Sequence, residues 1–217
     1  ALQTNPRHTD AHGVLARIAL VEGRRDEAVA RAQAQILAVH PRHPVGLAVL
    51  AAAGLAADDT AAFTRARDEA LAFSPSAVPF FLALTDVLVS MHLYEQTGDV
   101  LADATRRAPE DPYLQSAFGL NLLRLGKEPE GRAALTRAWK RDRFNERTRN
   151  TLDLYDQRID PHYTDVSSGD LRLRLPKEDA ELVQADLIAG IERARAALDR
   201  RYGMHPGPLR IEVFSDP

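Results

Sequence analysis

Cysteine is absent from the 217 residues of this chain, so neither a disulfide framework nor thiolate chemistry is available to it. Aromatic residues make up only 6% of the sequence, although 45% of it is hydrophobic. No apolar run approaches the length of a transmembrane helix, and no signal peptide is recognisable. The net charge of −3 gives no overall field for nucleic acid, so we expect no nucleic-acid partner. The compartment stays open between bacterial cytoplasm and periplasm.

Patterns for catalysis and metal binding are also missing. A zinc hydrolase needs two histidines one helical turn apart, with a glutamate beside the first as general base. Only His8 and His12 have this spacing, and the residue after His8 is Thr9. The glycines are scattered and form no phosphate-binding loop. We therefore expect no catalytic, cofactor-binding or metal-binding residue in this chain.

Proline recurs at a nearly constant spacing, with intervals of 35, 34 and 34 residues between Pro6, Pro41, Pro75 and Pro109. The clearest copy of the repeat is 111–145, which reads as one helix, a turn at Gly126 and a second helix. Such a pair has an apolar face on each side, so it becomes stable only when copies stack on it.

Several positions match the small and turn residues of one known repeat type: Gly23, Gly126, Ala28, Ala104, Ala138 and the Phe118-Gly119 pair. With the period of about 34 residues, the chain resembles a tetratricopeptide repeat protein over residues 1–157. The resemblance implies a mainly α fold, a right-handed α-solenoid of helix hairpins closed by a capping helix at 146–157. The chain begins in the phase of a closing segment, so we expect it to be part of a longer protein.

Two helices of this solenoid carry specific expectations. The segment 47–57 is almost entirely apolar, so we expect a helix buried on both sides. The first helix is expected to bury Val14, Leu15, Ile18 and Leu20, which follow helical spacing.

The concave groove is the one surface with a positive case for function. In the resembled family the first helix of each pair lines it, and this places the following side chains there: Arg17, Val49, Ala52, Leu82, Asp86, Tyr113, Leu120 and Arg124. The Lys/Asn constellation that clamps a terminal carboxylate in chaperone-binding members is absent. A mostly apolar groove favours a helix or an extended segment, from a protein or peptide partner or from the protein's own downstream domain. The alternative is a tightly wound superhelix whose groove is partly filled by its own side chains.

A basic run follows the last repeat, at Arg137, Lys140, Arg141, Arg143, Arg147 and Arg149, interrupted by Asp142 and Glu146. This pattern is typical of a solvated helix face. A contact with an acidic partner or with the following domain is the other interpretation.

The composition changes at Asp160-Pro161, and residues 158–169 are polar enough to predict a linker. Residues 170–217 predict a strand, a helix and a second strand, which form a small C-terminal β-α-β unit. In the first strand Leu171, Leu173 and Leu175 alternate with arginines, which indicates one buried and one exposed face.

This C-terminal part carries a second resemblance, through the motifs 150–155, 165–174, 198–203 and 211–216. They resemble the start of a peptidase MA-like domain of the gluzincin type, which follows tetratricopeptide repeats in some bacterial proteins. The family's zinc site lies on a downstream helix with His-Glu-x-x-His, and no position here matches it. The resemblance implies zinc and peptidase activity only for a longer parent protein. Two hypotheses remain: an interaction scaffold, or the substrate-recruiting or regulatory portion of a zinc metallopeptidase.

Overall fold

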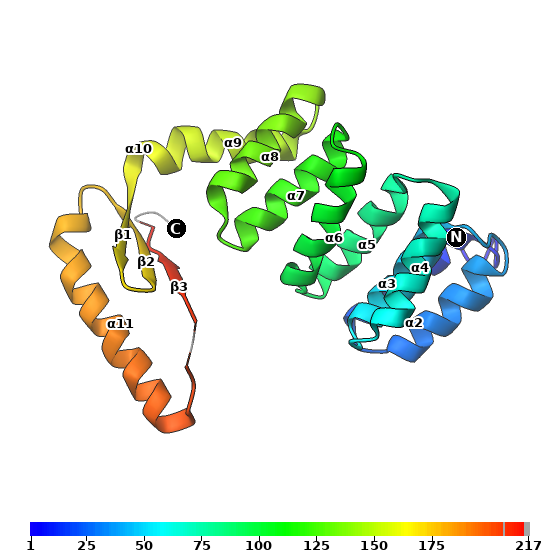
Figure 1. The fold of residues 1–217 in the computed structure, drawn as a ribbon, viewed down its shortest axis with the longest axis horizontal. Coiled ribbons are helices and arrows are strands. Elements are labelled where there is room, and N and C mark those ends of the chain that lie inside the picture. Colours follow the sequence, from blue (N-terminus) through cyan, green and yellow to red (C-terminus); the bar gives the residue numbers. More distant parts are fainter. Residues whose placement is uncertain (206, 215–217) are drawn as a thin grey trace. The chain divides into compact units, whose positions relative to one another are not determined.

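The computed structural model describes residues 1–205 and 207–214, and its contacts divide the chain into two compact units, 1–148 and 149–217 (Figure 1). The first unit consists of helix pairs: α1 (Thr9–Val21) with α2 (Arg25–Arg31) and its π-helical extension η1 (Ala32–Leu37), α3 (Pro44–Leu55) with α4 (Thr60–Phe73), α5 (Val78–Ser90) with α6 (Tyr94–Arg107), and α7 (Pro112–Arg124) with α8 (Glu128–Arg141). The first unit is therefore an α-solenoid of tetratricopeptide-like hairpins.

The turn inside every hairpin contains one residue with a left-handed backbone. These residues are Gly23, Asp58, His92 and Gly126, with φ between 54° and 78°. Their spacing of 35, 34 and 34 residues equals that of the prolines, so the turns and the prolines mark the same repeat. Each left-handed residue closely follows the end of the first helix of its pair, where this conformation lets the chain reverse.

The core of the first unit centres on α3, which is apolar all round and buried as the sequence predicts. Its small side chains let α1, α4 and α5 approach it from different sides. A Cβ on Gly54 would lie 2.8 Å from the backbone nitrogen of Phe63, so α3 and α4 meet there at backbone distance. Because α1 and α5 also contact each other, they close over the inner face of α3.

The first and fourth hairpins share a buried polar contact at equivalent positions. The Nε2–H of His12 donates to the carbonyl oxygen of Pro6 at 2.8 Å, and the Nε2–H of Gln115 donates to that of Pro109 at 2.9 Å. In the two middle hairpins the equivalent residues are Leu47 and Phe81, both buried. At this position the two end hairpins therefore have a polar side chain, and the two hairpins between them have an apolar one.

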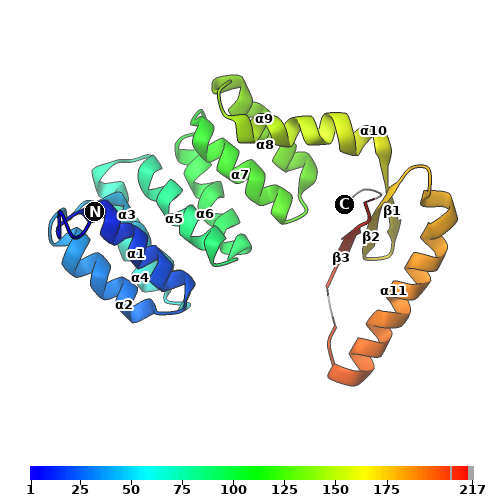
Figure 2. The ribbon, with the colours of Figure 1, turned by 180° about the vertical axis from the view of Figure 1, so that it is seen from behind.

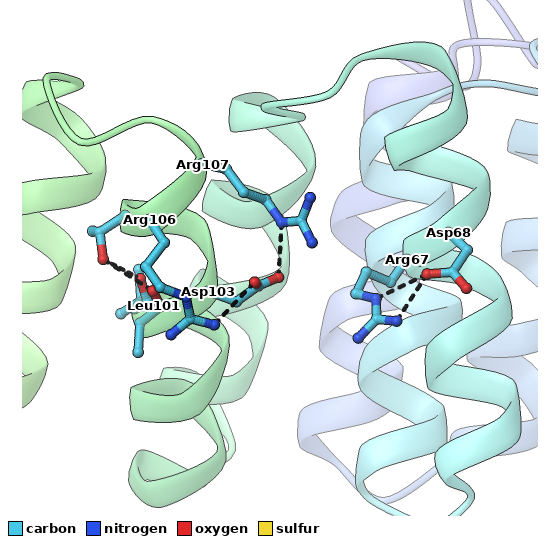
Figure 3. A network of polar contacts seen from close by, with 8 residues as sticks. Arg67, Asp68, Leu101, Asp103, Arg106 and Arg107 are labelled. Carbon is cyan, nitrogen blue, oxygen red and sulfur yellow. Dashed lines mark hydrogen bonds and ion pairs between the residues drawn. The ribbon is translucent and has the colours of Figure 1, made fainter.

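Short-range ion pairs lie on the second helices of the hairpins (Figure 3). On α6, Asp103 accepts from Arg106 at 3.1 Å and from Arg107 at 3.0 Å, while on α4 Arg67 pairs with Asp68 at 2.8 Å. Such exposed pairs contribute about 0–1 kcal/mol each. They describe a solvated surface rather than a binding site.

The apolar face predicted for α1 is wrong at three of its four residues. Leu20 is buried, but Val14, Leu15 and Ile18 are exposed. The buried face carries small residues instead, and Gly13 explains why: a Cβ there would lie 2.9 Å from Cγ1 of Val45. The sequence pattern misleads because α1 is apolar on both sides, and the tight approach to α3 selects the side with smaller residues.

The second unit begins within α9 (Glu146–Leu154), the helix that the sequence predicts as the cap of the solenoid. The helix continues through a π-helical turn η2 (Tyr155–Ile159) and α10 (Asp160–His162). The predicted linker 158–169 is wrong, because β1 (Tyr163–Ser168) follows directly. The polar residues of this segment do not show a strand pattern. The strand pairs antiparallel with β2 (Leu171–Pro176) across a tight turn at Gly169, where φ is +58°.

The remaining elements are α11 (Ala180–Tyr202) and β3 (Leu209–Glu212), which confirm the predicted strand–helix–strand order. The sheet order is β1-β2-β3, with β2 and β3 parallel, and α11 packs against the face of Leu171, Leu173 and Leu175 (Figures 1 and 2). The expectation that the arginines of β2 face solvent is wrong for Arg174, which is only 6% exposed. Its guanidinium lies across the opposite face of the sheet.

Two carboxylates explain this burial. Asp165 on β1 pairs with Arg174 through two contacts, Nε–Oδ1 at 2.8 Å and Nη2–Oδ2 at 3.1 Å, and Glu212 on β3 lies 3.9 Å from Nη1. The hydrogen bonds from Arg174 hold the pKa of Asp165 below its usual value, partly opposed by burial. A buried arginine with two-point recognition by a carboxylate links β1 to β2 through side chains as well as backbone.

Candidate interaction groove

The structure separates the predicted groove residues into two groups. Val49 and Ala52 are fully buried on α3, so their prediction as partner contacts is wrong: α1 and α5 close over this face. The other six keep solvent contact. Leu82 and Leu120 are half-buried, as is Arg17, whereas Asp86, Tyr113 and Arg124 are exposed. In its first half, the groove is therefore partly filled by the protein itself, which was the alternative interpretation.

A cavity of about 410 Å³ remains between α1 and α5. Its walls consist of the following side chains: Val14, Arg17, Ile18, Val21, Glu22, Val87 and Ser90. Arg17 is the one predicted groove residue among them. The apolar wall on α1 is well exposed, with Val14 at 55% and Ile18 at 44%. A helix with apolar residues on both faces normally packs against other elements on both faces. This face of α1 is therefore unusually apolar for a surface in contact with water.

The polar residues that line this cavity are few. Arg17 contributes a cation on α1, and Glu22 lies at the C-terminal end of the same helix. On α5 the hydroxyl of Ser90 donates to the carbonyl oxygen of Asp86 at 2.8 Å, so it is already used within its helix. Most of the lining thus offers apolar contact, and the side chains of Arg17 and Glu22 can orient a ligand.

None of the other predicted residues lines this cavity: Leu82 and Asp86 lie on α5, and Tyr113, Leu120 and Arg124 lie on α7. The guanidinium of Arg124 lies over the ring of Tyr94, 5.8 Å from its centre. Although the residue as a whole is exposed, partial desolvation of its guanidinium, reinforced by the positive charge of Arg147, lowers the pKa of Arg124 below its usual value. Arg124 and Arg147 are therefore close enough for their positive charges to oppose each other.

Neither a metal centre nor a membrane span is found in the part of the chain that the structure describes. No group of three His, Cys, Asp or Glu side chains there could hold a metal ion. Among the same residues, no helix is both long and apolar enough to cross a bilayer. The comparisons do not support the resemblance to a peptidase MA-like domain, and Ser215 and Asp216 of its last motif lie outside the described residues.

The helix pairs, their turn spacing and their stacking define the first unit as a tetratricopeptide-like repeat. No protein-family model and no curated protein matches the chain. Among solved structures, TTC0263, a thermophilic TPR protein of Thermus thermophilus, is 22% identical and covers 70% of this chain and 84% of its own, with a TM-score of 0.43. MamA of Desulfovibrio magneticus is 18% identical and covers 70% and 85%, with a TM-score of 0.42. Likenesses this weak carry no argument about function.

Sequence reasoning missed Val14, Ile18 and Val21 as groove residues. They sit on the apolar pattern of α1, which favours the core over the surface. A usable signal was present on the other face of the same helix, in the small residues Gly13, Ala16 and Ala19, which permit close packing.

Proposed function

We propose that the first unit is a protein-interaction scaffold that binds a helical segment of a protein partner between α1 and α5. The observation that carries the proposal is the exposed apolar face of α1 beside the 410 Å³ cavity. A helix laid there would cover Val14, Ile18 and Val21, and its polar face would stay in water. Recognition would act through shape and buried apolar area, with no cofactor.

A matched pair of substitutions tests the proposal. Ile18→Glu places a charge in the groove, and Leu198→Glu places one on α11, where the side chain is equally exposed at 45%. The probe is a fluorescent amphipathic helical peptide rich in alanine and leucine, measured by fluorescence anisotropy. We expect Ile18→Glu to weaken binding about tenfold and Leu198→Glu to leave it unchanged. Equal binding of the peptide by both variants would refute the proposal that the partner binds between α1 and α5.

The second hypothesis, a recruiting or regulatory portion of a larger zinc metallopeptidase, stays a prediction. It is supported only by the order β2, α11, β3, which many α/β units share. This chain by itself is expected to show no zinc-dependent cleavage. A fluorogenic peptide assay with and without added zinc tests that expectation, and zinc-dependent turnover would reveal a site that the sequence and the structure did not identify.

A further inference from the structure

The turn between α8 and α9 presents an aromatic side chain almost fully to solvent. Phe144 is 92% exposed, which is far more than any role in the fold requires. One, two and three repeats earlier, the equivalent positions hold Glu110, Ser76 and Arg42, all polar. The repeat architecture therefore does not call for an aromatic residue here.

The backbone around Phe144 is fixed rather than loose. Its own N–H donates to Oδ1 of Asp142 at 3.0 Å, and Oδ1 of Asn145 accepts from the N–H of Thr148 at 3.0 Å. Thr148 is fully buried, and its hydroxyl contacts that of Ser116 on α7 at 2.8 Å. A side chain presented by a fixed turn loses little freedom on binding, which favours its use as an anchor.

Cationic residues flank this anchor in the sequence. Residues 137–147 contain five cationic side chains against two acidic ones, in a chain whose net charge is −3. The guanidinium of Arg143, the residue before Phe144, lies over the ring of Trp139, 5.2 Å from its centre. Arg141 pairs with Glu110, whereas no carboxylate partner of Lys140 or Arg143 occurs within residues 1–205 and 207–214. We name Trp139, Lys140, Arg143 and Phe144 the Phe144 corner.

We propose that the Phe144 corner is a second interaction surface, which binds an acidic polypeptide segment carrying at least one large apolar side chain. The charge of the corner selects carboxylates, and arginine recognises them through two parallel hydrogen bonds. Phe144 supplies the apolar contact, and aromatic residues and arginine are the residue types enriched at the energetic centres of interfaces. Asp142 and Glu146 interrupt the positive charge, which suits a segment of defined sequence better than a uniformly anionic lipid surface.

This surface is independent of the groove at α1, so the two proposals can fail separately. The probe is a labelled peptide of glutamate and leucine, with a second peptide in which every glutamate is replaced by glutamine. Anisotropy with the whole chain is expected to show binding of the acidic peptide, weaker as salt rises, and about tenfold weaker binding of the neutral one.

Phe144→Ala is expected to weaken binding of the acidic peptide about tenfold. The matched control is Phe73→Ala, because Phe73 is also exposed, at 64%, and has an arginine close by, with the guanidinium of Arg42 4.8 Å from the centre of its ring. Equal effects of the two alanines, or equal binding of both peptides, would overturn the proposal. So would Phe144-dependent binding to phosphatidylserine vesicles without peptide binding, or Phe144-dependent self-association of the chain, because each assigns the corner to a different occupant.

Discussion

Gly119 on α7 and Gly131 on α8 meet at backbone distance: a Cβ on Gly119 would lie 2.8 Å from the carbonyl oxygen of Gly131, and one on Gly131 would lie 2.9 Å from that of Gly119. The same Cβ on Gly119 would lie 2.7 Å from Cγ of Leu135. The last hairpin is therefore closed by two glycines that face each other. No larger residue fits at either position without moving a helix.

Gly119→Leu should overpack this contact and destabilise the first unit by about 1–3 kcal/mol, seen as a lower melting temperature. Gly190→Ala is the control, because Gly190 also lies within a helix but its Cβ would meet only Arg193, at 3.9 Å. There the better helix propensity of alanine should stabilise by up to about 1 kcal/mol. An unchanged melting curve for Gly119→Leu would contradict the repeat phase.

The left-handed turn residues predict a second, purely conformational effect. Gly126 has φ +71° and no atom within 4 Å of its Cβ position, so Gly126→Ala meets no steric obstacle. We expect it still to destabilise by about 1 kcal/mol, because alanine disfavours this backbone. Asp58→Gly, at φ 54°, should act in the opposite direction by about 0.5 kcal/mol. Urea denaturation of both variants checks the signs, and equal signs would show that φ is not the cause.

His43 predicts a pH dependence of the first unit. Burial lowers the pKa of His43 below its usual value of 6.5, although Asp10, with Oδ1 3.5 Å from Nε2, partly opposes this. The unfolded chain therefore takes up the proton more readily than the folded one, so stability falls as pH drops from about 6.5. His43→Gln should flatten this part of the stability curve, measured by urea denaturation across the pH range. Asp10→Asn should steepen it, and a shallower curve for Asp10→Asn would show that the sign is wrong.

In the second unit, two aspartates with arginine partners allow a matched comparison. Asp165→Asn weakens the contact with buried Arg174 and is expected to destabilise the sheet by about 1–3 kcal/mol. Asp170→Asn weakens the contact of an exposed carboxylate with Arg195, at 2.6 Å, and should change little. Hydrogen exchange of the β1 and β2 amides measures both. Equal exchange rates in the two variants would mean that Arg174 does not hold the sheet together.

The same Asp165 has a pH signature. Because its folded pKa lies below the usual value, its contribution to stability is complete above the unfolded pKa and is lost as pH falls through the folded one. The loss in stability should therefore appear in acid, below about pH 4, well separated from that of His43. In the Asp165→Asn variant, the hydrogen-exchange rates of the β1 and β2 amides should no longer show this loss of stability in acid.

The repeat was predictable because its signals are local. The spacing of the prolines gives the length of the repeat, and Gly126 marks the turn within it. The burial of α3 is predictable from an unbroken apolar run. What failed depends on contacts across the fold. Val14 and Ile18 look like core residues, and only the closeness of α1 to α3 shows that the opposite face is buried. Likewise, the polar strand β1 is recognisable only through its partner Arg174.

The candidate groove was half predictable for the same reason. Repeat phase alone assigns Arg17 to the inner face, and Arg17 does line the cavity between α1 and α5. Ala52 has the same phase as Arg17, and Val49 lies one helical turn before it, yet the curvature that brings α1 against α5 covers both. Curvature is a sum over many small packing choices, and no single residue in the sequence encodes it.

The paired contacts of His12 with Pro6 and of Gln115 with Pro109 restrict how the hairpins can be rearranged. A duplicated middle hairpin would bring Leu47 or Phe81 next to another apolar neighbour, so the solenoid could be lengthened by insertion at its centre. An outer hairpin moved to the middle would take along the proline carbonyl that its polar side chain bonds, but it would place that polar side chain beside an apolar neighbour. The buried residues of each hairpin therefore favour one order of the hairpins. We expect the solenoid to tolerate an added middle hairpin better than an exchange of hairpins.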